Sequence, residues 1–420
     1  MAAPPTQIER GRPAAPPAVT QRVRQWGAAL GMPIASVLFA FVVGAIVIIV
    51  TGGDPVLAYQ SLLCGGFGAS CSGTVYPALQ LSETIVNTIP LILTGLSVAI
   101  AFRGGLFNIG AEGQLIAGVI ATTWVGIQFG TLPGFVLLPL VLIAGTLAGA
   151  LWGGIAGVLK AYTGAHEVVT TIMLNYIALY LLRYLIVAGP MELKGQHSVS
   201  ASIGAGGQLP TLIPSTAKLF DLPGAVYRAH TGIFIALAAA AFFAFLLKRT
   251  SLGYEIRAVG QSQRAARYAG VSVSRTIIVS MLLAGAFAGL SGAVQIAGLR
   301  HNLTDSYGPD STGFDGIAVA LLGQNTAIGA VLAAVLFAAL HVGGQFMQSN
   351  ANVSSHLVEI LQALILFSIA ANFLYSFRLR LPGLRRARSA APTIAEQGVV
   401  AVAPDRGPPA VPEPDKSGSV

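Results

Sequence analysis

Charged residues are scarce in this chain of 420 residues, since Asp, Glu, Lys and Arg together make up 10% of it. A soluble domain carries roughly a quarter charged residues, so this composition cannot cover a water-facing surface of the chain's size. The mean hydropathy is +0.73 and 54% of the residues are apolar. These values exclude a soluble enzyme, a nucleic-acid-binding domain and a disordered scaffold. They predict an all-α, polytopic membrane helix bundle, because a helix needs about 20 mostly apolar residues to cross the hydrocarbon.

Cysteine is nearly absent: Cys64 and Cys71 are the two in the sequence, and they lie in a Gly/Ser-rich segment between apolar stretches. On an oxidising side of the membrane they would form a small disulfide loop. The alternative is a pair of unlinked surface thiols. No metal site is expected here, because no His or further Cys lies nearby and zinc takes four ligands.

Catalytic motifs are also missing. The sequence contains no GxxxxGK[ST] phosphate loop, no GxSxG elbow, no HExxH pair and no Cys/His cluster. We therefore expect no catalytic residue, no metal and no cofactor held by the chain itself. A membrane enzyme is the weaker hypothesis.

Apolar stretches fill the middle of the sequence. Residues 1–30 and 379–420 are expected to be disordered cytoplasmic tails, because their Pro-, Ala- and Arg-rich composition lacks apolar periodicity. Residues 31–378 are expected to form the transmembrane domain. The predicted spans are about ten: 33–51, 84–102, 111–129, 134–159, 168–188, 231–247, 276–299, 310–322, 326–345 and 357–377. Without its polar start, the eighth is too short to cross alone.

The basic residues test this topology. With the N-terminal tail in the cytoplasm and alternating sides, 19 of the 24 Lys and Arg residues lie inside, four lie outside and Arg183 lies within a span. Cytoplasmic loops carry such an excess of Lys and Arg. Both termini are therefore predicted to be cytoplasmic, loop 248–275 lies inside, and loops 52–83 and 189–230 lie outside. The net charge of +8 needs no nucleic acid to explain it.

Polar, glycine-rich segments interrupt the apolar pattern twice. Residues 104–114 contain Asn108, Glu112 and Gln114, and residues 308–316 contain Asp315. Irregular backbone at membrane depth is tolerated where it packs on protein or lines a watery cavity, and a carboxylate there marks a functional site by default. We therefore take Asn108, Glu112, Gln114 and Asp315 as candidate groups of a translocation pathway. The alternatives are a cytoplasmic turn with a capped helix start and an outer loop leading into a short helix.

Other patterns predict packing and docking. Glycines recur every four residues from Gly145 to Gly157, and small residues do so from Gly285 to Ala297, as in helices that approach closely. Asn175 is expected to bridge helices by a hydrogen bond.

In the inside loop, residues 261–269 have helix-forming composition between the stops Gly260 and Gly270. Ala265, Ala266 and Ala269 make a small face that would seat in a groove of a soluble partner. The alternative is a solvated basic loop.

Several motifs in order resemble one family, the membrane permease subunits of bacterial ABC importers for branched-chain amino acids, simple sugars and nucleosides. They are GLFNIGAEGQ (105–114), HEVVTTIMLN (166–175), GYEIRAVG (253–260), RYAG (267–270) and GFDGIAVALLG (313–323). The first string is similar to the variant of the nucleoside and simple-sugar permeases. The resemblance covers roughly residues 35–378.

The resemblance implies a type II importer fold in the bacterial cell membrane and a division of labour. Residues 261–270 would be the coupling helix that docks on a separate ATP-binding subunit, with Gly260, Arg264, Ala265, Ala266 and Gly270 at the contact. Arg264 stands where the general signature has an acidic residue. The implied partners are a second, related permease chain, the ATP-binding subunit with its ATP and Mg, an extracytoplasmic binding lipoprotein and membrane lipid.

The resemblance implies inward transport of nucleosides. The alternatives are a ribose- or galactose-type sugar permease and, from another class, a secondary transporter in which Glu112 and Asp315 would be proton or sodium sites.

Overall fold

The computed structural model describes residues 18–69, 71, 77–195, 198–212, 227–305 and 312–370. Within these ranges the regular structure is helical, and extended segments meet only in isolated bridges such as that of Val199 with Thr304. The described residues all belong to one compact unit. The predicted all-α class is confirmed.

Most of the helices follow one another with short connections, and the longest connection joins α6 to α7. In chain order they are α1 (Ala18–Val50), α2 (Pro55–Phe67), α3 (Pro77–Arg103), α4 (Ala111–Gln128), α5 (Gly134–Thr163), α6 (Glu167–Val187), the 3-10 turn η1 (Ala205–Gly207), α7 (Gly232–Arg249), α8 (Ser251–Gln261), α9 (Gln263–Tyr268), α10 (Val273–Gln295), the π-helical turn η2 (Ile296–Arg300), α11 (Thr312–Leu322), α12 (Ala327–Ala351) and α13 (His356–Ala370).

Seven described helices are long and apolar enough to cross a membrane: α1, α3, α5, α6, α7, α10 with η2, and α12. The other three predicted spans correspond to α4, whose polar residues lower its hydropathy, and to the shorter helices α11 and α13. The prediction of a polytopic bundle of about ten helices is thus confirmed. Residues 371–377 of the predicted last span and the predicted tail 379–420 lie outside the described residues.

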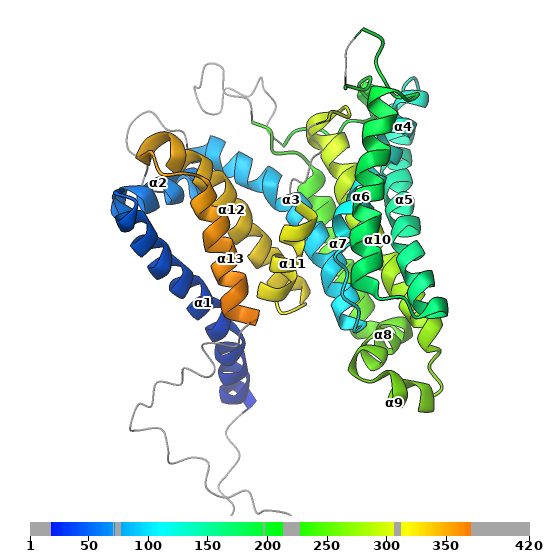
Figure 1. The fold of residues 1–420 in the computed structure, drawn as a ribbon, viewed down its shortest axis with the longest axis horizontal. Coiled ribbons are helices and arrows are strands. Elements are labelled where there is room, and N and C mark those ends of the chain that lie inside the picture. The colour runs from blue at the N-terminus through cyan, green and yellow to red at the C-terminus, as the bar shows by residue number, and fades with distance from the viewer. Residues whose placement is uncertain are drawn as a thin grey trace, which may run out of the picture. The chain divides into compact units, whose positions relative to one another are not determined.

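Helix α3 is central. It lies between one group made of α1, α2, α12 and α13 and another made of α4, α5, α6 and α10 (Figure 1). Of its most apolar stretch 78% is buried, against 22% for that of α5. The exposed apolar side chains of α5 and α6 therefore suit contact with lipid, while α3 belongs to the core.

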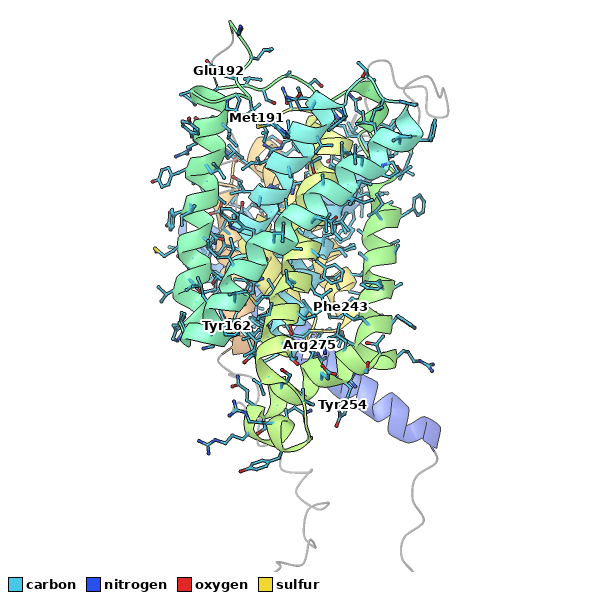
Figure 2. The ribbon with its side chains drawn as sticks, turned by 90° about the vertical axis from the view of Figure 1, so that its right-hand side faces the viewer. Tyr162, Met191, Glu192, Phe243, Tyr254 and Arg275 are labelled. Atoms are coloured by element: carbon cyan, nitrogen blue, oxygen red, sulfur yellow. A yellow bond between two sulfur atoms is a disulfide. The ribbon has the colours of Figure 1, made fainter. Side chains whose placement is uncertain are left out.

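Residues predicted on opposite sides of the membrane lie at opposite ends of the bundle. Tyr162, Tyr254 and Arg275 lie toward one end, and Met191 and Glu192 lie at the other (Figure 2). We name the first, which carries α8 and α9, the α9 end, and the second, which carries α2, the α2 end.

Small residues bring α5 and α10 into backbone contact. A Cβ on Gly149 would overlap the Gly285 oxygen, and one on Gly289 would overlap the Gly145 oxygen. A Cβ on Gly118 of α4 would likewise overlap the backbone of Gly289. The two predicted stripes therefore pack against each other, and the expectation of close helix approach is confirmed.

Two predicted boundaries at the N-terminal side are wrong. The expected tail 1–30 gives way to α1 at Ala18, where the Pro-rich composition ends and Ala, Gln and Arg, which favour helix, follow. The expected outer loop 52–83 contains α2 and the start of α3. Asp54 caps α2 by accepting from the Val56 amide at 2.8 Å, Pro55 occupies its first position, and Gly68 ends it with a φ of 67°.

Candidate functional site

The irregular connection between α3 and α4 is held by buried amide side chains. Asn108 is fully buried, and its Oδ1 accepts from the Gly110 N–H at 3.0 Å. It also exchanges two hydrogen bonds with Gln114: Asn108 Nδ2 donates to Gln114 Oε1 at 3.0 Å, and Gln114 Nε2 donates to Asn108 Oδ1 at 3.1 Å. An unpaired buried amide would cost about 1–3 kcal/mol, so this reciprocal pair stabilises the loop where the helix is broken.

Asn175 of α6 bonds to the same connection from outside. Its Oδ1 accepts from the Gly113 N–H at 2.8 Å, and its Nδ2 donates to the Ile109 carbonyl at 2.9 Å. The predicted helix-bridging role of Asn175 is confirmed.

Glu112 lies where two helices begin. It is in the first turn of α4, it is 6% exposed, and its Oε2 accepts a 2.7 Å hydrogen bond from the Gly313 N–H in the first turn of α11. Amide groups at helix N-termini carry partial positive charge, so both helix starts favour this carboxylate. Gly313 leaves room for the approach, since a Cβ there would lie 2.6 Å from Glu112 Cα.

The four predicted pathway residues are thus partly brought together. Asn108 and Gln114 bond to each other, Glu112 reaches α11, and Asp315 lies half-buried in the same first turn of α11. We name Asn108, Glu112, Gln114, Asn175 and Gly313 the Glu112 junction. With Asn108 and Gln114 at most 1% exposed, their amides here serve packing between helices. Contact of Asn108, Glu112, Gln114 and Asp315 with a substrate stays a prediction.

Helix α8 seats against the α3–α4 connection. Gly260 lies inside α8, and a Cβ on it would lie 2.9 Å from the Arg103 carbonyl carbon. Gly105, with a φ of 71°, also faces Gly260, since a Cβ on Gly105 would lie 3.0 Å from the Gly260 Cα. The prediction that Gly260 stops a helix is therefore wrong: it is a contact glycine where two backbones touch.

The segment predicted to be the coupling helix is not one continuous helix. Ser262 separates α8 from α9 and accepts from the Ala265 N–H at 3.3 Å, so the helix expected over 261–269 covers Gln263–Tyr268 instead. Gly270 follows it with a φ of 81°.

The side chains of α9 point in different directions. Arg264, Ala265 and Gly270 are exposed, whereas Ala266 is 3% exposed and turns into the chain's own core. Of the expected small face, Ala265 and Ala269 are thus on the surface and Ala266 is not. Tyr268, which sequence reasoning did not select, is 94% exposed. A protruding aromatic residue beside basic ones is a signal that could have identified it.

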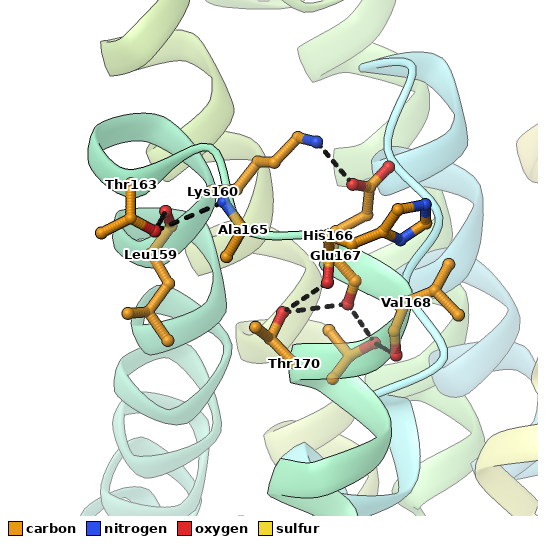
Figure 3. A network of polar contacts seen from close by, with 9 residues as sticks. Leu159, Lys160, Thr163, Ala165, His166, Glu167, Val168 and Thr170 are labelled. Atoms are coloured by element: carbon orange, nitrogen blue, oxygen red, sulfur yellow. Dashed lines mark hydrogen bonds and ion pairs between the residues drawn. The ribbon is translucent and has the colours of Figure 1, made fainter.

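The α5–α6 turn adds an ion pair near the same end. Lys160 Nζ lies 2.8 Å from Glu167 Oε2, and Thr170 Oγ1 donates to the Glu167 carbonyl at 3.1 Å (Figure 3). The turn itself is tightened by Thr163, whose Oγ1 accepts from the Ala165 N–H at 3.3 Å. This pair positions the start of α6, the helix that carries Asn175.

At the α2 end a polar pocket of about 350 Å³ lies between α3, α12 and the segment before α7. It is lined by Gln80, Glu83, Asn87, Arg228, Val342, Gln345, Phe346 and Ser349. Arg228 Nε donates to Glu83 Oε1 at 2.8 Å, and its Nη2 donates to the second carboxylate oxygen. The hydrogen bond to Glu83 raises the pKa of Arg228.

The sequence did not predict this pocket, because residues 52–83 were expected to form a loop. Once α3 is known to begin at Pro77, Gln80, Glu83 and Asn87 fall on one helix face by their spacing. That periodicity was readable in the sequence.

Two histidines meet close by. His230 is 2% exposed, and burial lowers its pKa to about 4, with His301 adding to the shift. Burial also lowers the pKa of His301. Gly298 allows the packing, because a Cβ on it would lie within 2.6 Å of the His230 ring. Both histidines are therefore neutral at pH 7.

The two cysteines are joined in a disulfide, which ties Cys64 in α2 to Cys71 in the chain leading to α3. Of the two alternatives that the sequence left open, the structure has the linked one. Among the described residues no three His, Cys, Asp or Glu side chains come close enough to hold a metal ion.

The chain is a bundle of apolar helices with a buried polar junction, the Glu112 junction, where α4 begins. The short helix α9 is exposed at one end. These features are those of a polytopic membrane permease. The chain belongs to the family described as the branched-chain amino acid transport system / permease component, whose model matches residues 80–370. The resemblance suggested by the sequence motifs is confirmed.

Relatives whose names give a substrate are similar to this chain over most of its length. It is 40% identical to the guanosine ABC transporter permease protein NupP of Bacillus subtilis, over 82% of this chain and 94% of the relative. It is 36% identical to the nucleoside ABC transporter permease protein NupB of Lactococcus lactis, over 83% and 92%. It is 37% identical to the glucose ABC transporter permease protein TsgB13 of Haloferax volcanii, over 86% and 93%. No solved structure matches the chain significantly.

Proposed function

We propose that this chain is the transmembrane permease subunit of an ABC importer that moves nucleosides into the cell. The observation that carries the proposal is the identity of 36–40% to guanosine and nucleoside permeases across more than four fifths of the chain. Glucose transport is the second candidate, because the Haloferax volcanii relative is about as similar. Both substrate classes present several hydroxyl groups, so either would need polar hydrogen-bonding groups along the route.

In this proposal ATP is used by other subunits. The sequence has no phosphate loop, so ATP and Mg would bind a separate ATP-binding subunit. A second permease chain and an extracytoplasmic binding lipoprotein would complete the importer in the cell membrane, with the α9 end and both termini in the cytoplasm. The lipoprotein would deliver substrate to the α2 end.

The polar pocket at the α2 end supports this delivery. Asn87 and Gln345 offer amide donors and acceptors, Glu83 with Arg228 fixes one wall, and the ring of Phe346 offers an apolar face. Amides and carboxylates bind hydroxyl groups, and aromatic rings stack on nucleobases. The pocket thus combines what a ribose and a base each require.

The contacts of α8 support coupling to the ATP-binding subunit. The exposed side chains of α9, above all Tyr268, would dock on that subunit. A displacement of α9 would move α8, whose Gly260 touches Arg103 and Gly105. That connection leads within a few residues to the Glu112 junction and thereby to α11. Glu112 in the first turn of α4 and Asp315 in the first turn of α11 are the groups that we propose to change surroundings when the pathway opens.

The pocket is tested by uptake of labelled guanosine in cells that hold the whole importer, at equal membrane abundance. Gln345→Leu removes a pocket amide, and we expect uptake to fall about tenfold, as loss of one hydrogen bond of roughly 1.4 kcal/mol predicts. Gln348→Leu is the matched control on the same helix, because Gln348 is exposed and does not line the pocket. Full uptake by Gln345→Leu would remove the pocket from the pathway.

A further inference from the structure

A second, apolar cavity lies at the α9 end. It has a volume of about 810 Å³ and is lined by α1, α7, α8, the end of α3, the turn after α11 and the start of α12. Pockets for small molecules span roughly 300–1,000 Å³. Ile34 and Leu38 of α1 and Leu332 of α12 line it and are 56–61% exposed. These side chains offer a hydrocarbon-lined wall that no described part of the chain covers.

One rim of this cavity is cationic. Arg103 ends α3, Lys248 lies in the last turn of α7 and Arg257 lies in α8, and all three line the cavity. Among the described residues no carboxylate lies within ion-pair distance of any of them. The charge of Arg257 acts directly on Arg103. Three convergent positive charges without a counter-ion favour an anion at this rim.

The backbone carbonyl and the side-chain amide of Asn325 also lie at this rim. Arg103 Nε donates to the Asn325 carbonyl at 3.0 Å, which holds the guanidinium at the turn between α11 and α12. Asn325 Oδ1 is buried and meets no hydrogen-bond donor within the described part of the chain.

We propose that this cavity binds an anionic phospholipid of the cytoplasmic leaflet, with an acyl chain along α1 and α12 and the phosphate between Arg103, Lys248 and Arg257. The occupant must be apolar at one end and anionic at the other, and basic pockets between membrane helices on the cytoplasmic side bind such headgroups. The chain's own termini do not match the rim. Residues 371–420 hold seven basic against four acidic residues, and residues 1–17 hold two against one. The proposal rests on the orientation given under Proposed function.

The site has a consequence for coupling. Arg257 belongs to α8, and α8 touches the α3–α4 connection through Gly260. A lipid phosphate that binds Arg103 and Arg257 together would hold α8 against α3. We therefore expect anionic lipid to stabilise this contact.

The test uses the purified full chain in detergent and measures its thermal unfolding with added phosphatidylglycerol or phosphatidylcholine. We expect phosphatidylglycerol to raise the Tm and phosphatidylcholine to leave it unchanged. The double variant Lys248→Gln, Arg257→Gln should lose at least half of that rise. Arg275→Gln is the matched control, because Arg275 is an exposed arginine at the same end that does not line the cavity.

A second variant separates acyl binding from headgroup binding and guards against misfolding. Ala244→Trp fills the cavity beside Phe243 without changing charge, and it should also reduce the rise. Equal stabilisation by phosphatidylcholine, a full rise in both variants, or the same rise with inorganic phosphate alone would each overturn the proposal. Because no transport is measured, failure here is distinct from failure of nucleoside uptake.

Discussion

Buried amides and carboxylates determine how the chain breaks and restarts helices. Asn108 and Gln114 satisfy each other six positions apart, while Glu112 bonds to Gly313, 201 positions away. The polar character of these residues and the bridging by Asn175 were predictable from the sequence, since isolated polar groups in apolar surroundings need partners. The partner of Glu112 was not, because one sequence carries no record of which distant helix starts meet.

Protonation of His230 should lower stability at acidic pH. Its folded pKa of about 4 lies below the ordinary 6.5, so the unfolded chain binds more protons between these values. Stability is therefore complete above pH 6.5 and is lost as pH falls toward 4, by about 2 kcal/mol at pH 5. The Tm in detergent from pH 7.5 to 4.5 measures this effect.

His230→Gln should flatten that part of the profile. His356→Gln is the control, because the His356 side chain is 79% exposed and should leave the profile unchanged. An equally steep loss in His230→Gln would show that another group is responsible.

For the helices, the sequence showed start and stop signals and small-residue stripes, but it did not show which helices contact one another. The stripes of small residues in α5 and α10 predicted close packing, and the structure adds that each stripe is the other's partner. Helix α2 has ordinary start and stop signals, Asp54 with Pro55 and Gly68, but its 13 residues are too few to stand out as a span. The break at Ser262 in the inside loop depends on how α8 packs, which composition does not convey.

A large side chain in the α5–α10 contact should separate the helices. In Gly149→Leu the new side chain would overlap the Gly285 carbonyl oxygen and Gly289. Overpacking of this kind costs typically 1–3 kcal/mol or more, so the Tm should fall by several degrees. Leu151→Phe adds bulk on the exposed face of the same helix, where Leu151 is 68% exposed, and should leave the Tm unchanged. Equal Tm values for both variants would contradict the packing.

At the scale of the whole molecule, the two ends are fitted for different partners. The α2 end holds the polar pocket and the disulfide, and the α9 end holds the exposed α9 and the basic rim of the apolar cavity. The sequence predicted which residues share an end through its Lys and Arg distribution, and it predicted the family through separated motifs. The spacing of Gln80, Glu83 and Asn87 indicates one wall of the polar pocket, but neither complete cavity was predictable, because each is formed by residues from helices far apart in the chain.

The most direct measurement is uptake of labelled guanosine by proteoliposomes that contain this chain with its partner permease, the ATP-binding subunit and the binding lipoprotein. Uptake should require ATP enclosed with the ATP-binding subunit, should persist with a proton and sodium uncoupler, and should be suppressed by unlabelled nucleosides but not by glucose. Uptake that ignores ATP and stops with the uncoupler, or that glucose alone suppresses, would contradict a nucleoside-importing ABC permease.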